Sequence, residues 1–234
     1  MPFGVDEAGK GPVFGSMFAA AVWAPTRDAL PDGVADSKRL SLERRETLAE
    51  TIRADARLRV GVAEITTDRI DAPDTDMNGL AVEAHASALE GAVEASGAAE
   101  AAGESPSTLE HGGTSEPPVV HCDACDTDAE RFARRVADAC ALETTVEATH
   151  GADDDDPLVG AASIVAKVER DAHVAAIADE YGEVGSGYPS DPTTRAFLEE
   201  YVARCGALPP FARASWSTCA DVLADAEQTG LGQF

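Results

Sequence analysis

Lysine, aromatic residues and long apolar runs are all scarce in this sequence of 234 residues. The only lysines are Lys10, Lys38 and Lys167, and acidic residues outnumber basic ones by 43 to 18, which gives a net charge of −25. Hydrophobic residues nevertheless make up 44% of the chain, enough for a core, and this excludes a wholly disordered protein. Because the acids are spread through periodic segments, the composition is typical of a globular protein adapted to concentrated salt.

Two further absences bear on where the protein works. The sequence contains no apolar run long enough to span a membrane, and its N-terminus lacks a basic stretch followed by an apolar one, so we expect neither a membrane span nor secretion. The cysteines lack the spacing of a disulfide scaffold, which favours reduced thiols in a cytoplasmic protein. Cys122 and Cys125 have the spacing of half a zinc site, but no second pair follows at usable spacing, so buried thiols are the preferred interpretation.

Apolar periodicity predicts an α/β fold in which a mixed sheet is flanked by helices. We expect strands at residues 3–8, 13–24, 58–65, 119–123 and 142–148, and helices at 41–55, 77–95, 128–140, 157–180, from 192 onward and at 217–227. Ser41 and Asp191 are placed to cap two of these helices. Between residues 96 and 118 the chain becomes small, polar and rich in Gly, Ser and Pro, which predicts a flexible surface insertion.

Acidic residues near strand ends form the main candidate site. Asp6 and Glu7 end the first strand before a Gly-Lys-Gly turn, and Asp123 ends another strand. Asp153 opens a run of four aspartates before a helix. Carboxylates from separate strand ends can converge on one edge of a sheet, where four of them can hold two Mg²⁺ ions and clamp a phosphate. In a chain this acidic, a metal-free acidic edge and solvated charge at a helix N-terminus explain the same residues.

Basic residues supply a second candidate feature. Ser163, Lys167 and Arg170 recur at helical spacing and therefore share one face of a helix. This face can make phosphate contacts, or it can be an ordinary solvated surface on which neighbouring acidic residues pair with the basic ones. Because lysine is so scarce, the retention of Lys167 and Lys38 favours a functional role.

Four blocks of the sequence resemble, in order, the signature blocks of the ribonuclease HII family, most closely its archaeal branch. The blocks are residues 5–12 (VDEAGKGP), 36–40 (DSKRL), 161–171 (AASIVAKVERD) and 185–192 (GSGYPSDP). The resemblance implies a ribonuclease H-like fold: a five-stranded mixed sheet with flanking helices and a helical C-terminal extension. We therefore expect a catalytic domain at residues 1–180, a helical extension at 181–227 and a tail at 228–234.

The resemblance also implies an endoribonuclease that uses Mg²⁺ or Mn²⁺, with two ions at the site during catalysis. The implied substrates are RNA in RNA–DNA hybrids and single ribonucleotides embedded in duplex DNA. Cleavage is expected 5′ of the ribonucleotide, leaving 3′-hydroxyl and 5′-phosphate ends, with roles in primer removal and ribonucleotide excision. Two rival functions remain: a related nuclease that acts only on long hybrids, and a non-catalytic cation- or hybrid-binding protein of the same fold.

Specific residues match the family's site. Four carboxylates hold the metals in the family, and the matching positions here are Asp6, Glu7, Asp123 and Asp153. The expected readers of the ribose 2′-hydroxyl at the RNA-to-DNA junction are Gly9, Lys10, Gly11 and Tyr188. Without the resemblance, a packing role would be the preferred interpretation of Tyr188. Candidate phosphate contacts are Lys38, Asn78, Lys167 and Arg170. The family usually has arginine where Lys10 stands, and the further aspartates 154–156 crowd the fourth carboxylate position.

The last seven residues carry another resemblance. Gln228, Leu231 and Phe234 have the spacing of the motif by which replication and repair proteins dock on the sliding clamp, proliferating cell nuclear antigen. One helical turn places Leu231 and Phe234 on one side as an apolar plug, and Gln228 can hydrogen-bond at the rim of a pocket. An ordinary frayed chain end is the alternative. We otherwise expect a monomer that does not associate with membranes.

Overall fold

The computed structural model describes residues 2–34, 40–101 and 117–231, the side chains of 96–101 and 229–231 excepted. These residues form two compact units, each assembled from separate stretches of the chain. Unit 1 comprises Met1–Ala8, Phe18–Glu64 and Asn78–Val168, and unit 2 comprises Gly9–Met17, Ile65–Met77 and Glu169–Phe234. None of the described helices is long and apolar enough to cross a membrane.

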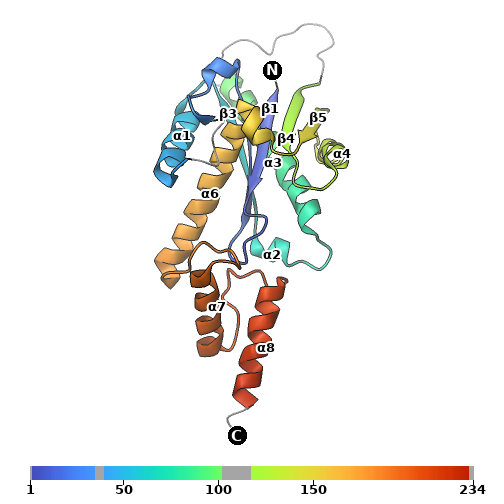
Figure 1. Cartoon of the computed structure of the whole chain (residues 1–234). Coiled ribbons are helices and arrows are strands. Elements are labelled where there is room, and N and C mark those ends of the chain that lie inside the picture. Colours follow the sequence, from blue (N-terminus) through green and yellow to red (C-terminus); the bar gives the residue numbers. More distant parts are fainter. Residues whose placement is uncertain (1, 35–39, 102–116, 232–234) are drawn as a thin grey trace. The chain divides into compact units, whose positions relative to one another are not determined.

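Unit 1 is built on a five-stranded mixed sheet with the order β3-β2-β1-β4-β5 (Figure 1). Its strands are β1 (Phe3–Ala8), β2 (Met17–Trp23), β3 (Arg59–Ile65), β4 (Val119–Asp123) and β5 (Thr145–Thr149). The central strand β1 pairs antiparallel with β2 and parallel with β4, and β4 runs parallel to β5. The parallel pairing brings the C-terminal ends of β1 and β4 to the same edge of the sheet.

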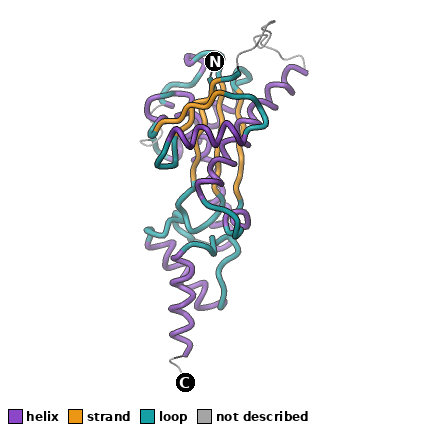
Figure 2. Tube along the Cα trace, turned by 90° about the vertical axis from the view of Figure 1, so that its right-hand side faces the viewer, coloured by secondary structure: helices purple, strands orange, loops and turns teal. Residues whose placement is uncertain are grey.

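Helices cover both faces of this sheet (Figures 1 and 2). The helices of unit 1 are α1 (Leu42–Ala54), α3 (Met77–Ala101), α4 (Ala129–Ala139), the short α5 (Ala152–Asp155) and the first half of α6 (Pro157–Tyr181), with a 3-10 turn at Arg27–Ala29. On one face, α1 and α6 form an apolar core with β2, where Ile52 and Leu158 pack with Val22. On the other face, the backbone of α3 approaches β3 so closely that a Cβ on Gly61 would lie 2.1 Å from the Ala88 carbonyl oxygen.

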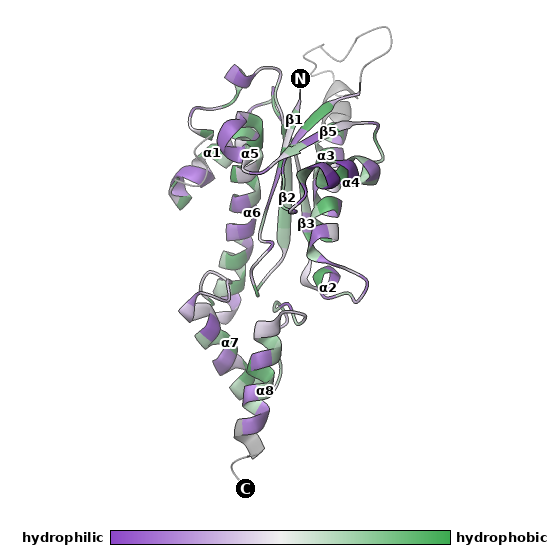
Figure 3. Cartoon of the chain, turned by 45° about the vertical axis from the view of Figure 1, so that its right-hand side comes forward, coloured by the Kyte–Doolittle hydropathy of each residue, from purple (hydrophilic) through white to green (hydrophobic). Residues whose placement is uncertain are grey.

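Unit 2 consists of α2 (Thr67–Ile70), the second half of α6, α7 (Pro192–Cys205), α8 (Ser217–Leu231) and the loops around them. Phe14 lies at its centre and meets Phe197 and Phe211 edge-on, with ring centroids 5.8 and 5.2 Å apart. A single antiparallel bridge joins Phe14 to Ala212. Hydrophilic and hydrophobic residues both occur along α6, α7 and α8 (Figure 3), as expected for helices that bury one side.

The predicted α/β fold with a five-stranded mixed sheet is confirmed, and so are the Ser41 and Asp191 caps, which accept hydrogen bonds from the backbone N–H groups of Arg44 and Thr193. The strand predicted at 13–24 was wrong at its start and begins at Met17, because the chain turns at Gly15, where φ is +77°. The expected boundary between residues 180 and 181 stays a prediction.

The predicted helix at 77–95 was wrong at its end and continues to Ala101, into the segment expected to be an insertion, because alanine and glutamate favour helix there. Of the remaining insertion residues, 102–116 lie outside the described part of the chain. The last helix likewise extends past residue 227 to Leu231. The four-residue helices α2 and α5 were not predicted, since so short a segment carries no helical periodicity.

Candidate functional site

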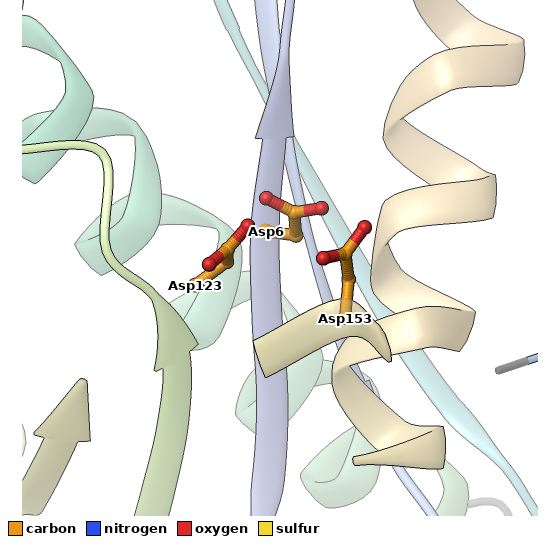
Figure 4. Close-up of side chains that lie close together, drawn as sticks. All are labelled: Asp6, Asp123 and Asp153. Atoms are coloured by element: carbon orange, nitrogen blue, oxygen red, sulfur yellow. The ribbon is translucent and has the colours of Figure 1, made fainter. Parts of the chain in front are cut away.

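Three carboxylates from different elements of unit 1 point toward one another (Figure 4). Asp6 lies on β1, Asp123 is the last residue of β4 and Asp153 lies in α5. Each offers an oxygen within 4.8 Å of the others. Asp6 and Asp153 are only 4% and 1% exposed, and Asp123 is half-buried. We call these three residues the carboxylate cluster.

Strand register and local hydrogen bonds explain how the cluster forms. Val5 of β1 stands opposite Cys122 of β4, so Asp6 and Asp123 are the next residues along two parallel neighbours. The Oδ1 atom of Asp123 then accepts hydrogen bonds from the backbone N–H groups of Gly151 and Ala152, at 2.6 and 3.1 Å. These bonds hold the start of α5 against the end of β4, and Asp153 follows immediately.

The fourth predicted carboxylate, Glu7, lies outside the cluster. Adjacent strand residues point to opposite faces, and the Glu7 Oε2 atom lies 2.9 Å from the Nε2 atom of His85 on α3. His85 is completely buried and meets the Phe132 ring edge-on, with centroids 5.1 Å apart. The role of Glu7 as a metal ligand stays a prediction. His85 was missed because no sequence motif marks it and its contact with Glu7 is long-range.

Burial and mutual repulsion make the carboxylate cluster unfavourable as three bare anions. Burial, followed by the neighbouring Glu7 carboxylate, raises the pKa of Asp6 well above its ordinary value. Burial and then the Asp153 charge raise the pKa of Asp123. A divalent cation would relieve this repulsion, and closely spaced carboxylate oxygens are the donors that Mg²⁺ and Mn²⁺ prefer. The donor set therefore fits such an ion.

The structure places Lys167 beside this cluster. Its Nζ atom lies 3.8 Å from an Asp153 carboxylate oxygen and donates a hydrogen bond to the Ser163 hydroxyl on the same face of α6. Ser163 is itself completely buried, and its hydroxyl lies 3.5 Å from the same Asp153 oxygen. The helical spacing predicted this shared face correctly. Asn78 stands near the start of α3, and Lys38 falls outside the described residues.

Unit 2 brings together the residues expected to read the ribose. A Cβ on Gly11 would lie 3.7 Å from the Tyr188 ring, so the Gly-Lys-Gly turn and this ring are neighbours. Tyr188 is 39% exposed, which argues against a purely packing role. The Arg170 guanidinium lies 4.9 Å from the centre of the Tyr188 ring and donates a hydrogen bond to the Ser186 carbonyl oxygen. Gly9 has a φ of +91°, which side-chain-bearing residues rarely adopt.

The predicted clamp-binding tail is only partly covered by the structure. Gln228 is exposed on α8, whereas the Leu231 side chain and Phe234 lie outside the described residues.

All five cysteines are free, and burial raises the pKa of the Cys122 thiol, in keeping with an unreactive buried thiol.

Comparisons with known proteins agree on one family. The ribonuclease HII family model matches residues 3–219. The chain is 58% identical to ribonuclease HII of Haloarcula marismortui over 234 residues, all of both chains. It matches ribonuclease H2 from Pyrococcus horikoshii with a TM-score of 0.81 at 34% identity, covering 97% of this chain and 98% of that one.

The structure of the PCNA:RNase HII complex from Archaeoglobus fulgidus also matches, with a TM-score of 0.75 at 34% identity over 95% of this chain and 96% of that chain. These relatives span nearly the whole length of the sequence and share its fold. The chain therefore belongs to the ribonuclease HII family, whose members are metal-dependent endoribonucleases that act on RNA–DNA hybrids.

Proposed function

We propose that this protein cleaves the strand 5′ of a ribonucleotide, both in RNA–DNA hybrids and where a single ribonucleotide lies in duplex DNA, leaving 3′-hydroxyl and 5′-phosphate ends. The observation that carries the proposal is the carboxylate cluster of Asp6, Asp123 and Asp153, whose oxygens lie within 4.8 Å of one another. Such a nuclease serves primer removal and ribonucleotide excision. The free cysteines favour the reducing cytoplasm as its location.

The carboxylate cluster would hold Mg²⁺ or Mn²⁺, with Glu7 as the fourth carboxylate and two ions present during catalysis. When bound, such ions activate water and stabilise the departing 3′-oxygen of an in-line displacement. Lys167, 3.8 Å from Asp153, supplies a positive charge where the scissile phosphate would otherwise meet only carboxylates. Ser163 accepts a hydrogen bond from Lys167 and so fixes the position of that charge.

Discrimination between RNA and DNA must depend on the 2′-hydroxyl, the group that the two sugars do not share. We assign this reading to the backbone of Gly9, Lys10 and Gly11 together with the Tyr188 hydroxyl. The proximity of Gly11 to the exposed Tyr188 ring supports the assignment. Because the backbone does the reading, lysine can replace the arginine usual at position 10. Arg170, which is packed on the Tyr188 ring, is a further candidate for a phosphate contact, together with Lys38 and Asn78.

A net charge of −25 opposes the approach of a polyanionic substrate. Bound divalent ions would offset the negative charge of the acidic residues at the site, and concentrated salt screens the negative charge of the remaining surface within a few ångströms. We therefore expect cleavage to persist in molar KCl and the fold to loosen in dilute buffer. A sharp activity optimum in dilute salt, with the structure intact there, would contradict this explanation.

The decisive experiment compares cleavage of two labelled duplexes, one with a single ribonucleotide and one a long RNA–DNA hybrid, with Mg²⁺ and with Mn²⁺, at high and low KCl. The proposal requires cleavage of both duplexes, 5′ of the ribonucleotide. Cleavage of the hybrid alone would favour the long-hybrid nuclease, and binding without cleavage would favour the non-catalytic protein.

A matched pair of variants connects the activity to the carboxylate cluster. Asp153→Asn removes a buried member of the cluster, whereas Asp154→Asn alters the exposed residue that follows it. We expect Asp153→Asn to abolish turnover without unfolding the protein, and Asp154→Asn to cleave at the wild-type rate. Equal activity in the two variants would refute the assignment.

We also propose that residues 228–234 dock on a sliding clamp. The support is the Gln228, Leu231 and Phe234 spacing, together with the matching structure of an archaeal relative, which is a complex with PCNA. Deletion of residues 228–234 should abolish clamp binding in calorimetry and leave cleavage of short duplexes unchanged. Equal clamp affinity with and without the tail would exclude this docking mode. We expect the protein itself to be monomeric, which light scattering would test.

A further inference from the structure

An arginine that no motif marked occupies the interior of unit 2. Arg213 belongs to the segment of the chain that connects α7 to α8, and it is the largest completely buried side chain in the described part of the protein. Burial lowers its pKa to about 10, so it remains charged at neutral pH. A buried charge is costly unless it is fully hydrogen-bonded. The hydrogen-bond partners of Arg213 therefore indicate which segment of the protein this side chain positions.

Those partners are backbone carbonyl oxygens of a single loop. Nη2 of Arg213 donates to the Gly9 carbonyl at 2.6 Å, Nη1 to Lys10 at 3.0 Å and Nε to Gly15 at 2.9 Å. The same loop is the Gly-Lys-Gly turn to which ribose reading is assigned above. The planar guanidinium presents its donors in a fixed fork, so three simultaneous bonds set the orientation of the loop as well as its position.

Peptide geometry determines what this orientation exposes. All described peptide bonds are trans, and in a trans peptide the C=O and the following N–H point in opposite directions. The carbonyls of Gly9 and Lys10 point at the guanidinium, so the N–H groups of Lys10 and Gly11 point away from it. Gly11 is exposed and lies beside Tyr188. By binding the two carbonyl groups, Arg213 thus orients the loop so that the N–H groups of Lys10 and Gly11 lie on the side away from the guanidinium.

Neighbouring contacts hold both the arginine and the loop. Asp71 accepts hydrogen bonds from the backbone N–H groups of Ala214 and Ser215 at 2.7 and 2.9 Å, which fixes the segment that carries Arg213. The Arg213 guanidinium also lies 4.9 Å from the centre of the Trp216 ring. On the other side of the loop, Val13 N–H donates to the carbonyl of Gly187, the residue before Tyr188, at 2.7 Å.

We propose that Arg213 is a positioning residue for ribonucleotide recognition, which holds the Lys10 and Gly11 amides in the orientation that binds the ribose 2′-hydroxyl. The inference rests on the function proposed above and adds a residue to it. Arg213 does not touch the substrate; it acts through the loop. Its loss should therefore reduce discrimination between a ribonucleotide and a deoxyribonucleotide more than it reduces affinity for duplex DNA.

The test measures the affinity of the full-length protein for a fluorescent duplex DNA with one ribonucleotide and for the same duplex without it. Anisotropy is read at fixed KCl with Ca²⁺ in place of Mg²⁺, so that binding is followed without cleavage. The discrimination ratio is the quotient of the two dissociation constants. We expect Arg213→Gln to lower this ratio by about tenfold, since a mispositioned donor loses a hydrogen bond to the substrate, and Arg213→Lys to restore part of it.

Two further variants separate positioning from general stability. Leu198→Ala truncates a completely buried leucine in the core of unit 2, so it should destabilise the fold yet keep the wild-type ratio. If Arg213→Gln does not fold, the discrimination ratio of Asp71→Asn takes its place in the test and should also fall, because this variant loosens the segment that carries Arg213 but keeps the guanidinium and its carbonyl partners. A wild-type ratio in folded Arg213→Gln, or an equal loss in Leu198→Ala, would overturn the inference. No discrimination by the wild-type protein would instead overturn the assignment of ribose binding to this loop, whereas the proposed function itself fails only if the wild-type protein does not cleave the duplex that contains a ribonucleotide with Mg²⁺ or Mn²⁺.

Discussion

Replacing Asp6 by asparagine should make the metal-free protein more stable, although it removes a residue of the proposed active site. Burial and then the neighbouring Glu7 carboxylate raise the pKa of Asp6, which means that the folded protein disfavours its ionised form. Asparagine has nearly the same shape and can still hydrogen-bond to Ser163, the side-chain partner of Asp6. The substitution therefore removes a charge without creating a cavity.

The separation of the charges gives the size of the effect. Oxygens of Asp6 and Asp123 lie within 4.8 Å, and at an effective dielectric constant of about 20 two unit charges at that distance repel by roughly 3 kcal/mol. Attraction to Lys167 offsets part of this repulsion, so we expect Asp6→Asn to raise the free energy of unfolding by about 1 to 3 kcal/mol. In a chain of this length, that gain corresponds to roughly 2 to 12 °C in Tm.

The assay is thermal unfolding in molar KCl at neutral pH, first with a chelator and then with Mn²⁺. Asp6→Asn should melt above wild type in chelator, and Mn²⁺ should stabilise wild type more than the variant. An acid with a raised pKa takes up its proton in the folded state first, so the gap should close as the pH falls. Asp154→Asn is the control and should respond to Mn²⁺ like wild type. The reasoning fails if Asp6→Asn melts below wild type in chelator.

Three further outcomes are expected. Gly4→Ala should cost at least about 2 kcal/mol in denaturant unfolding, because its Cβ would lie 2.2 Å from the Leu158 carbonyl carbon; a neutral effect would refute this packing. His85→Ala should raise the Mn²⁺ concentration for half-maximal activity about tenfold by releasing Glu7, and an unchanged metal titration would exclude that role. Hydrogen bonds from Ser186 lower the pKa of Asp191 from 3.8 to about 2. Asp191→Asn should therefore be less stable at neutral pH, with the difference vanishing as the pH falls through that interval.

The local elements were predictable because their signals are local. Ser41 and Asp191 cap helices within one turn of their own positions, and the apolar runs of β1 and β4 are readable from a few adjacent residues. The sequence also indicated that Asp6, Glu7 and Asp123 lie near strand ends. The ends of helices were less predictable, since the alanine-rich continuation of α3 looks like a loop by composition while its intrinsic propensity is helical.

Only the tertiary structure decided which of these residues meet. The parallel register of β1 and β4 brings Asp6 beside Asp123, and the bonds from Gly151 and Ala152 to Asp123 select Asp153 from four consecutive aspartates. The contact of Arg213 with Gly9 joins residues 204 positions apart. Periodicity reports which face of an element is apolar, but it carries no information about which distant element will cover that face. Residues brought together by strand register and long-range hydrogen bonds are therefore visible only in the folded chain.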